Sequence, residues 1–262
     1  MTSVDANAPF GSEQDTFAGE GTGSRLAGEI AAGGTLPRAP GVKRPGLWRS
    51  VWLVVEIVVL YLVVPIVLIH VVLSYRLPLF AVLPPMLATF VTILLLDRGF
   101  SLRRELGRGV RLRTLLSILA TFAVAGGAIA YAVSELMPRH FLNMMMERRD
   151  VWERIMLLYP FLSVVPQEIA YRTFFFHRYG PLFRDNRVAL IVINGLLFGF
   201  GHVLFANWLA VAGTFVTGML FAWRYHASRS FWAVWIEHTL WGWLVFTVGL
   251  GGFFFTGVAN LR

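Results

Sequence analysis

From Leu47 onward, the sequence is a succession of apolar runs separated by short loops. A helix needs roughly 20 predominantly apolar residues to cross a bilayer, and it satisfies its own backbone polar groups there. The runs that reach or approach this length are 47–73, 77–96, 113–135, 153–178, 187–205, 207–226, 231–242 and 243–257. The sequence therefore predicts an all-α polytopic membrane protein with about eight transmembrane helices. The last two runs are short and are either half-spans or one broken helix.

The composition agrees with a membrane protein. Of the 262 residues, 56% are hydrophobic and 15% are charged, whereas an ordinary soluble domain has about 25% charged residues. The net charge of +8 could suggest a nucleic-acid partner, but most arginines lie in short loops between apolar runs, which is a signal of topology. We therefore expect the lipid bilayer as a partner and no nucleic acid. The chain has no cysteine, which excludes disulfides, thiolate metal sites and a cysteine nucleophile.

Residues 1–46 differ from the rest of the chain. They are rich in Gly, Ala, Ser, Thr and Pro and contain no long apolar run, which predicts a disordered tail before a helical domain of residues 47–262. They also lack the basic start and apolar core of a signal peptide. Lys and Arg are concentrated in alternate loops, beginning with 38–49 and 97–113. This bias predicts a multi-pass protein of the cell membrane with a cytoplasmic N-terminus.

Ionisable residues interrupt the fourth apolar run, in the stretch PQEIAYRTFFFHRYG. Glu168 and Arg172 are four residues apart, so they share one face of a helix. Pro166 removes a backbone hydrogen bond just before them, which predicts a kink. Charged side chains inside a membrane are costly and generally mark a functional site. The alternative on this stretch alone is a structural ion pair.

Two later stretches bring further polar groups into the apolar interior. FGFGHVLFANW holds His202, and WIEHTLWGWLVF holds the adjacent residues Glu237 and His238. Neighbours on a helix face directions about 100° apart, so only one of the adjacent pair can point squarely into a shared cavity. Each histidine alone could be a hydrogen-bonded packing residue. If the helices converge, Glu168, Arg172, His202 and His238 line one water-accessible cavity, and Glu237 points away from it.

One glutamate and two histidines suit two kinds of chemistry. Glu168 could activate water as a general base, with His202 holding the water and His238 stabilising the oxyanion. Alternatively, the same three side chains could bind zinc with an open fourth position. Other hydrolase designs are excluded, because the sequence has no HExxH, no GxSxG around its serines in the apolar runs, and aspartates only in the tail and loops.

Three blocks in this order resemble the CPBP family, which comprises CAAX prenyl endopeptidases and bacteriocin-processing enzymes and is also called the Abi family. The blocks of the family are EExxxR, FxxxH, and a histidine followed four residues later by Asn or a similar residue. Here they read Gln167-Glu168-Ile169-Ala170-Tyr171-Arg172, Phe198-Gly199-Phe200-Gly201-His202 and His238-Thr239-Leu240-Trp241-Gly242. The resemblance covers roughly residues 150–250. It implies an eight-helix intramembrane fold and a glutamate-dependent endopeptidase without a cofactor, although some members were long described as metalloproteases.

The sequence departs from the family pattern at two positions. Gln167 stands where the family has its water-activating glutamate, and a neutral amide cannot act as a general base. Gly242 stands where the family often has Asn, so one oxyanion donor is missing. Either Glu168 takes over the role of base, or the chain is a specialised or non-proteolytic member. Asn194 and Asn207 are candidate replacements as polar partners.

Two functions remain open. The first is an intramembrane endopeptidase that cuts a peptide or protein at the bilayer, with Glu168 as base and Arg172 orienting it. The second is a non-proteolytic membrane protein, such as an immunity or partner-binding factor, that uses the cluster as structural support. Gln167 favours the second function. The presence of Glu168, Arg172, His202 and His238 together favours the first. A transporter is disfavoured, because the two halves lack paired Gly- or Pro-broken segments.

Overall fold

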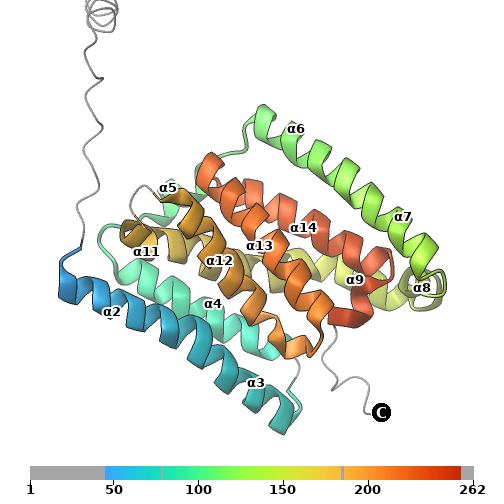
Figure 1. Cartoon of the computed structure of the whole chain (residues 1–262), viewed down its shortest axis with the longest axis horizontal. Helices are drawn as coiled ribbons and strands as arrows, with labels where there is room; N and C mark the ends of the chain where they lie inside the picture. The colour runs from blue at the N-terminus through green and yellow to red at the C-terminus, as the bar shows by residue number, and fades with distance from the viewer. Residues whose placement is uncertain (1–44, 78, 184–185, 255–262) are drawn as a thin grey trace, which may run out of the picture. The chain divides into compact units, whose positions relative to one another are not determined.

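The computed structural model describes residues 45–77, 79–183 and 186–254. Almost all of the predicted tail, residues 1–46, lies outside the described residues. The described residues form helices and contain no strand (Figure 1), which confirms the all-α prediction. With η for π- and 3₁₀-helical segments, the elements are α2 (Leu47–Val58), η1 (Val59–Val63), α3 (Val64–Tyr75), α4 (Leu79–Leu96), α5 (Leu102–Leu106), α6 (Leu112–Thr121), η2 (Phe122–Gly126), α7 (Gly127–Leu136), α8 (Asn143–Glu147), α9 (Arg149–Tyr159), η3 (Pro160–Val164), α10 (Val165–Glu168), η4 (Ile169–Phe174), α11 (Phe175–Phe183), α12 (Arg187–Gly201), η5 (Val203–Phe205), α13 (Trp208–Ser228), α14 (Phe231–Thr247) and η6 (Leu250–Phe254).

Several of these elements are continuous and long enough to cross a membrane. Among the described residues, three helices have both the length and the apolar composition of a membrane span: Leu47–Tyr75, Leu112–Leu136 and Arg187–Phe205. Val82–Leu96 is a shorter apolar helix. These segments coincide with four of the predicted runs. The fold is that of an all-α polytopic membrane protein.

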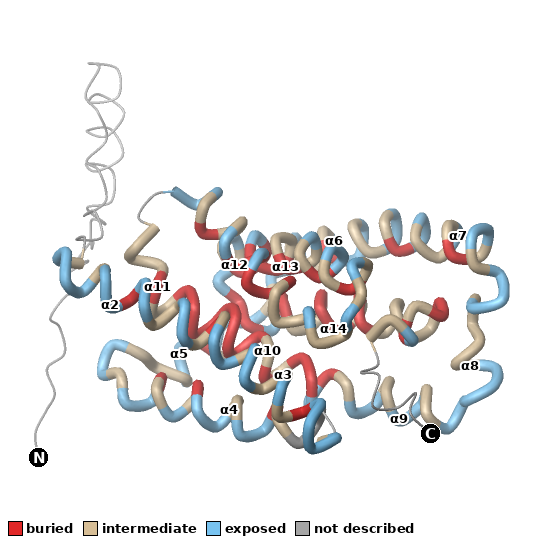
Figure 2. Tube along the Cα trace, turned by 60° about the horizontal axis from the view of Figure 1, so that its bottom comes forward, coloured by how far each residue is buried: buried red, intermediate tan, exposed pale blue. Residues whose placement is uncertain are grey.

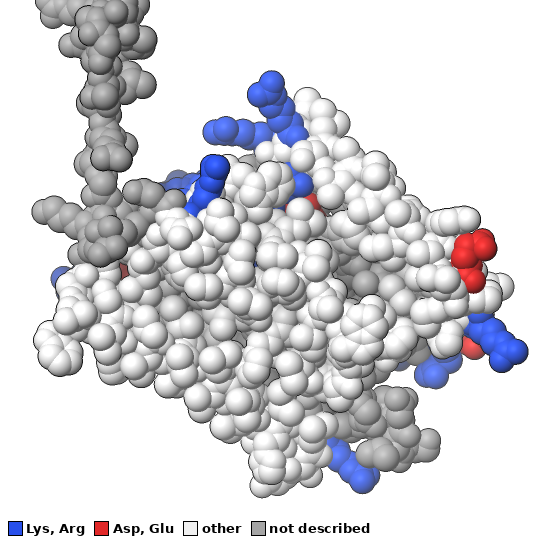
Figure 3. Space-filling view, in the orientation of Figure 1, with Lys and Arg blue, Asp and Glu red and all other residues white. Residues whose placement is uncertain are grey.

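The surface agrees with a lipid environment. Many large apolar side chains of α2, η1 and α3 are exposed, including Trp48 and Ile66. Figure 2 shows the exposed residues along α2 to α4, while buried residues follow α10, α11 and α14 inside the bundle. In Figure 3, the broad face over α2, α12 and α13 carries few charged side chains, and the arginines that it shows gather near the helix ends. A large apolar surface of this kind marks an interaction site, here the bilayer.

The fourth predicted run is a long, irregular helical segment. It runs from α9 through η3, α10 and η4 to α11, so α10 with Pro166 lies between two π-helical segments. Proline cannot donate a backbone hydrogen bond, and π-helical turns are frequent at functional sites. Every residue of η4, Ile169–Phe174, is buried. This segment therefore carries Glu168 and Arg172 through the interior of the bundle.

The last helices pack closely around this segment. A methyl group added at Gly195 of α12 would lie 3.0 Å from the backbone nitrogen of Met219 on α13. The glycine therefore permits the close approach of the two helices, as small residues do in membrane helix packing. The boundary between the runs 231–242 and 243–257 is not a helix end, and of the two alternatives for these runs the structure favours one broken helix over two half-spans. Helix α14 runs unbroken through Gly242 to Thr247 and is followed by the 3₁₀ segment η6. Residues 255–257 lie outside the described part of the chain.

Candidate active site

Glu168 is the centre of a buried cluster. It is the last residue of α10, and its side chain has no exposed surface. Its Oε1 lies 2.7 Å from Nδ1 of His238 on α14, and its Oε2 lies 3.4 Å from Nε of Arg172, which is also fully buried. Two of the three sequence blocks therefore meet directly at one carboxylate.

His238 links this carboxylate to Tyr159. Its Nε2 lies 3.1 Å from the Tyr159 hydroxyl. Because Nδ1 faces the Glu168 carboxylate, we assign the proton to Nδ1, which leaves Nε2 to accept from the tyrosine hydroxyl. The ring of His238 also stacks on Phe221, with 4.7 Å between ring centroids. Both nitrogens and one face of the imidazole are thus fixed.

Tyr159 is a site residue that the sequence blocks do not reveal. It ends α9 and belongs to none of the three blocks. One signal could have found it: a tyrosine hydroxyl buried in an apolar segment usually needs a hydrogen-bond partner. The partner, His238, lies on a helix distant in the sequence, so only the fold reveals the pair.

Arg172 is held by aromatic rings and a backbone carbonyl as well as by Glu168. Its Nη2 donates to the carbonyl oxygen of Gly218 at 3.2 Å. Its Cζ lies 4.4 Å from the centroid of the Phe198 ring and 5.4 Å from that of Phe221. Guanidinium groups over aromatic faces at such distances are attracted by the ring quadrupole. These contacts therefore hold Arg172 in place although its Nε lies as far as 3.4 Å from the Glu168 carboxylate.

His202 lies at the edge of the cluster. It caps the C-terminus of α12 and is half-buried, and its Nδ1 lies 2.7 Å from the carbonyl oxygen of Phe198. In the described part of the chain, it makes no hydrogen bond to Glu168 or His238. The Phe198 ring contacts both imidazoles, with centroids 4.7 Å from His202 and 5.6 Å from His238. The predicted convergence is therefore direct for three residues and indirect for His202.

Gln167 points to a different neighbour from Glu168. Its Nε2 donates to Oγ of Ser163 at 2.8 Å, and its Oε1 is buried without a hydrogen bond to any described residue. The amide therefore lies beside Glu168 on the same helical segment, but it makes no hydrogen bond to the described His238.

The space next to Gly242 is occupied by Tyr159. A methyl group built on Gly242 would lie 2.1 Å from Cε1 of the tyrosine ring.

Asn194 and Asn207, the candidate replacements, are engaged elsewhere. Asn194 donates to the carbonyl oxygen of Tyr171 at 2.6 Å. Asn207 accepts from the backbone at the start of α13 and donates to the carbonyl oxygen of Phe253. Among the described residues, the His238 side chain hydrogen-bonds to the Glu168 carboxylate and the Tyr159 hydroxyl and to no other group.

Glu237 points away from the cluster, as predicted. Its two carboxylate oxygens lie 2.8 and 2.9 Å from Nε and Nη2 of Arg224. Nη1 of Arg224 donates to Ser117 on α6 at 3.0 Å. This pair is bidentate, the strongest geometry between a guanidinium and a carboxylate.

The prediction of a water-accessible cavity is wrong for Glu168 and Arg172 in this structure. Both side chains are fully buried, because the rings of Phe198, Phe221 and Tyr159 surround the cluster. An apolar groove of about 460 Å³ lies between α6–α7 and α13 and reaches Trp241 on α14, but neither carboxylate nor histidine of the cluster lines it. Of the side chains at the cluster, Tyr159, Gln167 and His202 are half-buried, so the cluster comes nearest to the surface at these three residues.

Several buried polar atoms of the cluster have no hydrogen-bond partner among the described residues: Glu168 Oε2, Gln167 Oε1, Arg172 Nε and Arg172 Nη1. An unsatisfied buried polar atom costs about 1–3 kcal/mol, so native proteins keep few of them, and those they keep call for an explanation. Oε2 of Glu168 is therefore a carboxylate oxygen that lies 3.4 Å from Nε of Arg172 and accepts no hydrogen bond from a described residue.

The residues present do not fit a zinc site. Among the described residues, no three His, Asp or Glu side chains are placed to hold one metal ion. Oε1 of Glu168 faces the protonated nitrogen of His238, and Oε2 faces Arg172. We therefore derive no step through a metal.

The fold and the cluster together define a polytopic helical membrane protein with a buried glutamate–histidine–arginine centre. Residues 149–244 match the family model described as Type II CAAX prenyl endopeptidase Rce1-like. This confirms the resemblance to the CPBP family over the stretch that holds all three blocks, and it identifies the segment as related to a family of proteases. No curated protein and no solved structure matches the chain.

Proposed function

We propose that this protein is an intramembrane endopeptidase that hydrolyses a peptide bond of a membrane-associated substrate. The observation that carries the proposal is the buried Glu168 carboxylate, which is oriented by His238 and Arg172 and keeps one oxygen without a hydrogen bond. A carboxylate held in this way can accept a proton from water as a general base. The match of residues 149–244 to an endopeptidase family supports the same reaction class.

The mechanism assigns a role to each member of the cluster. Oε2 of Glu168 takes a proton from water as the water oxygen attacks the scissile carbonyl carbon. The carboxylic acid then gives this proton to the leaving amine as the C–N bond breaks. His238 holds Oε1 through Nδ1–H, and Tyr159 fixes the tautomer of His238. Arg172 supports the negative charge of the carboxylate before the proton transfer.

His202 is proposed as the group that meets the substrate. It is half-buried at the end of α12, and its Nε2 makes no hydrogen bond to a described residue, so this nitrogen can hold the water or donate to the oxyanion. Because the Phe198 ring lies between His202 and the rest of the cluster, substrate binding has to shift this ring before water reaches Glu168. We further propose that no metal takes part and that Gln167 is an auxiliary polar group in the site.

The orientation follows from the arginine bias. We propose that the N-terminus and the 97–113 loop are cytoplasmic, since this loop carries six arginines and cytoplasmic loops carry the excess of positive charge. The partners are then the bilayer and a peptide or protein held in it.

The second candidate is a non-proteolytic member of the family that uses the cluster structurally. Gln167 and the full burial of Glu168 favour it. It predicts that the acidity of Glu168 is dispensable, whereas the proposed endopeptidase requires it.

The test compares Glu168→Gln with Glu237→Gln in the purified full-length protein. Both glutamates are buried and both face an arginine, so the chemical change is matched. Membrane-anchored peptides, prenylated and unprenylated, serve as substrates, and mass spectrometry detects the products. Glu168→Gln should reduce cleavage by about 10²–10⁴, the usual contribution of a general base. Glu237→Gln should lower the thermal midpoint more, because it breaks a bidentate pair, yet the folded fraction should still cleave.

A chelator and added zinc should both leave the rate unchanged. Cleavage by Glu168→Gln at the wild-type rate would refute the assignment of the base. If the wild-type protein cut none of the peptides, the non-proteolytic alternative would be favoured.

A further inference from the structure

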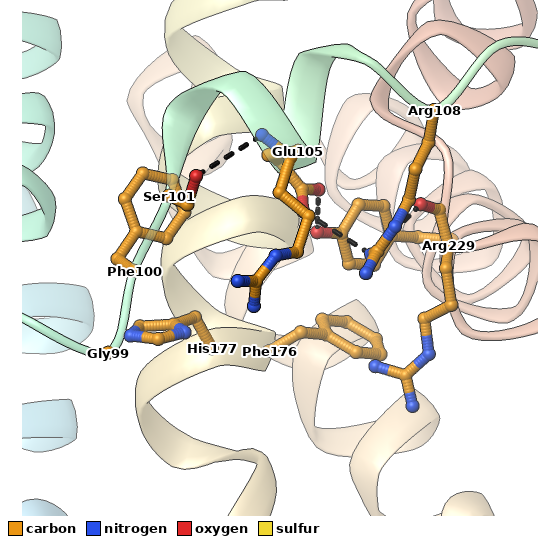
Figure 4. Close-up of a pocket in the computed structure, with 10 residues that line it drawn as sticks. Gly99, Phe100, Ser101, Glu105, Arg108, Phe176, His177 and Arg229 are labelled. Carbon is orange, nitrogen blue, oxygen red and sulfur yellow. Dashed lines mark hydrogen bonds and ion pairs between the residues drawn. The ribbon is translucent and has the colours of Figure 1, made fainter.

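A second polar site lies outside the Glu168 cluster, at the end of the bundle where α5, α11 and α13 meet. It is a cavity of about 150 Å³, shown in Figure 4. Phe100 and His177 lie on one side of it, and Arg108 and Arg229 on the other (Figure 4). Its lining is Gly99, Phe100, Ser101, Arg104, Glu105, Arg108, Phe176, His177, Tyr225 and Arg229.

The cavity has an excess of positive charge. Three arginines line it against one carboxylate, Glu105. That carboxylate is already engaged, since it accepts a hydrogen bond from the hydroxyl of Tyr225 and lies 3.6 Å from Nη1 of Arg108. Among the described side chains, no carboxylate lies within ion-pair distance of Arg104 or Arg229. Two guanidinium groups are therefore left for an external anion.

The arginines are attached to a fixed backbone. Arg229 ends α13 in the left-handed conformation, with φ of 53°, and its N–H donates to the carbonyl oxygen of Tyr225 at 2.8 Å. Nη1 of Arg108 reaches the carbonyl oxygen of Arg229 at 3.5 Å, and Oγ of Ser230 donates to the carbonyl oxygen of Arg108 at 2.9 Å. The segment after α5 and the end of α13 are thus tied together across the cavity.

The cavity also lies at a level where a membrane ends. The apolar helix α4 ends just before it, and α14 begins just after Arg229. Trp232, 38% exposed, donates from its indole N–H to the carbonyl oxygen of Leu106 at 2.8 Å. Tryptophan is enriched at the boundary between membrane and water, with its ring at the depth of the headgroups. The cavity opening is therefore within reach of lipid headgroups.

We propose that this cavity binds the phosphate of an anionic phospholipid headgroup. Guanidinium groups match phosphate oxygens in charge and geometry, and basic residues at the cytoplasmic surface attract anionic lipids. Topology alone explains why arginines are frequent in the 97–113 loop, but it does not require that two of them converge with Arg229 on one hollow. The proposal is independent of the hydrolytic function.

The test measures lipid binding to the full-length protein in neutral detergent by native mass spectrometry. The probes are short-chain phosphatidic acid, phosphatidylcholine with the same chains, and inorganic phosphate. We compare the wild type with Arg104→Gln, Arg229→Gln and the double variant. Arg103→Gln is the matched control, because it removes the same charge from the same short helix without lining the cavity. Each arginine near a membrane surface contributes about 1 kcal/mol. Arg104→Gln and Arg229→Gln should therefore each weaken binding of phosphatidic acid about five-fold and the double variant about 25-fold, whereas Arg103→Gln should weaken it less than two-fold.

The wild type should bind phosphatidic acid more tightly than either other probe. Equal losses in Arg103→Gln and the cavity variants would overturn the proposal, since diffuse loop charge would then explain the binding. Equal affinity for inorganic phosphate would overturn the assignment to a lipid. Thermal unfolding without added lipid checks that each variant is folded. The lysine variants Arg104→Lys and Arg229→Lys keep the charge but lose the planar guanidinium, so they should bind phosphatidic acid more tightly than the glutamine variants and less tightly than the wild type.

Discussion

The contact between Gly242 and Tyr159 makes a prediction whose sign is opposite to the usual one. Replacing a helical glycine by alanine normally stabilises a protein by about 0.4–1 kcal/mol, because the unfolded chain loses freedom. A methyl group at Gly242 would lie 2.1 Å from Cε1, 2.4 Å from Cζ and 2.6 Å from Oη of Tyr159. Carbon atoms normally approach to about 3.5–4.0 Å. The ring would have to move by more than about 1 Å, so Gly242→Ala should destabilise the protein by about 1–3 kcal/mol, as overpacking does.

The matched control is Gly213→Ala. Gly213 lies within α13, and a methyl group there meets no atom within 4 Å. It should therefore show the normal stabilisation. The assay is thermal unfolding of the purified full-length protein in detergent. In a domain of this size, 1 kcal/mol corresponds to about 2–4 °C, so Gly242→Ala should lower the midpoint by about 2–12 °C, while Gly213→Ala should raise it by about 1–4 °C.

A second background shows whether Tyr159 is the cause. In Tyr159→Ala, the ring is gone, so adding Gly242→Ala should no longer destabilise. The coupling energy between the two changes should be about 1.4–4 kcal/mol, the difference between the overpacking cost and the usual gain. Tyr159→Phe keeps the ring but removes the hydroxyl that faces His238. It should stay within about 1 kcal/mol of the wild type in stability and lose roughly ten-fold in cleavage rate, which corresponds to one hydrogen bond.

The reasoning is refuted if Gly242→Ala is as stable as the wild type or more stable. The tyrosine ring would then not fill the space beside α14. Position 242 would merely lack a polar side chain, and an asparagine there could be accommodated and restore it. In the arrangement described above, Gly242→Asn should instead lower both stability and cleavage.

The remaining predictions concern Gln167 and the orientation in the membrane. Gln167→Glu should preserve or raise the cleavage rate, because the Ser163 hydroxyl can donate to the new carboxylate. Loss of cleavage with an unchanged thermal midpoint would contradict the proposed role of this position. Ser101→Cys introduces a single thiol into a cysteine-free chain. This thiol should not react with a membrane-impermeant reagent in intact cells, and it should react after the membrane is opened. Labelling in intact cells would show that the 97–113 loop is outside the cell.

The course of the helices follows from run length and composition, which is why most spans could be predicted. The exception is the stretch around Gly242, where the sequence pattern predicts a boundary between two short runs. Glycine costs a helix about 1 kcal/mol in water, but in membrane helices small residues are common at contacts between helices. Here Gly242 makes room for Tyr159, so α14 continues through it.

The pairing of Glu168 with His238 could be anticipated because a buried charge needs a partner and few are present. The position of His202 could not. It caps α12 rather than lying within it, and the direction of a side chain at a helix end depends on how the following segment packs. Tyr159 could not be placed either, because its contact with His238 depends on the mutual position of α9 and α14.

The two buried arginine–glutamate pairs show what a purely structural pair looks like in this fold. Glu237 and Arg224 exchange two short hydrogen bonds, and Arg224 adds a third to Ser117. The Glu168–Arg172 contact is longer, at 3.4 Å, and leaves atoms of both side chains without a hydrogen bond in the described part of the protein.

Since each such atom costs about 1–3 kcal/mol, a cluster used only to hold helices together would be expected to resemble the Glu237 pair, which the same bundle builds one residue away from His238. The looser pair leaves a carboxylate oxygen with unused capacity to accept a proton. A general base needs that capacity, and a structural ion pair does not.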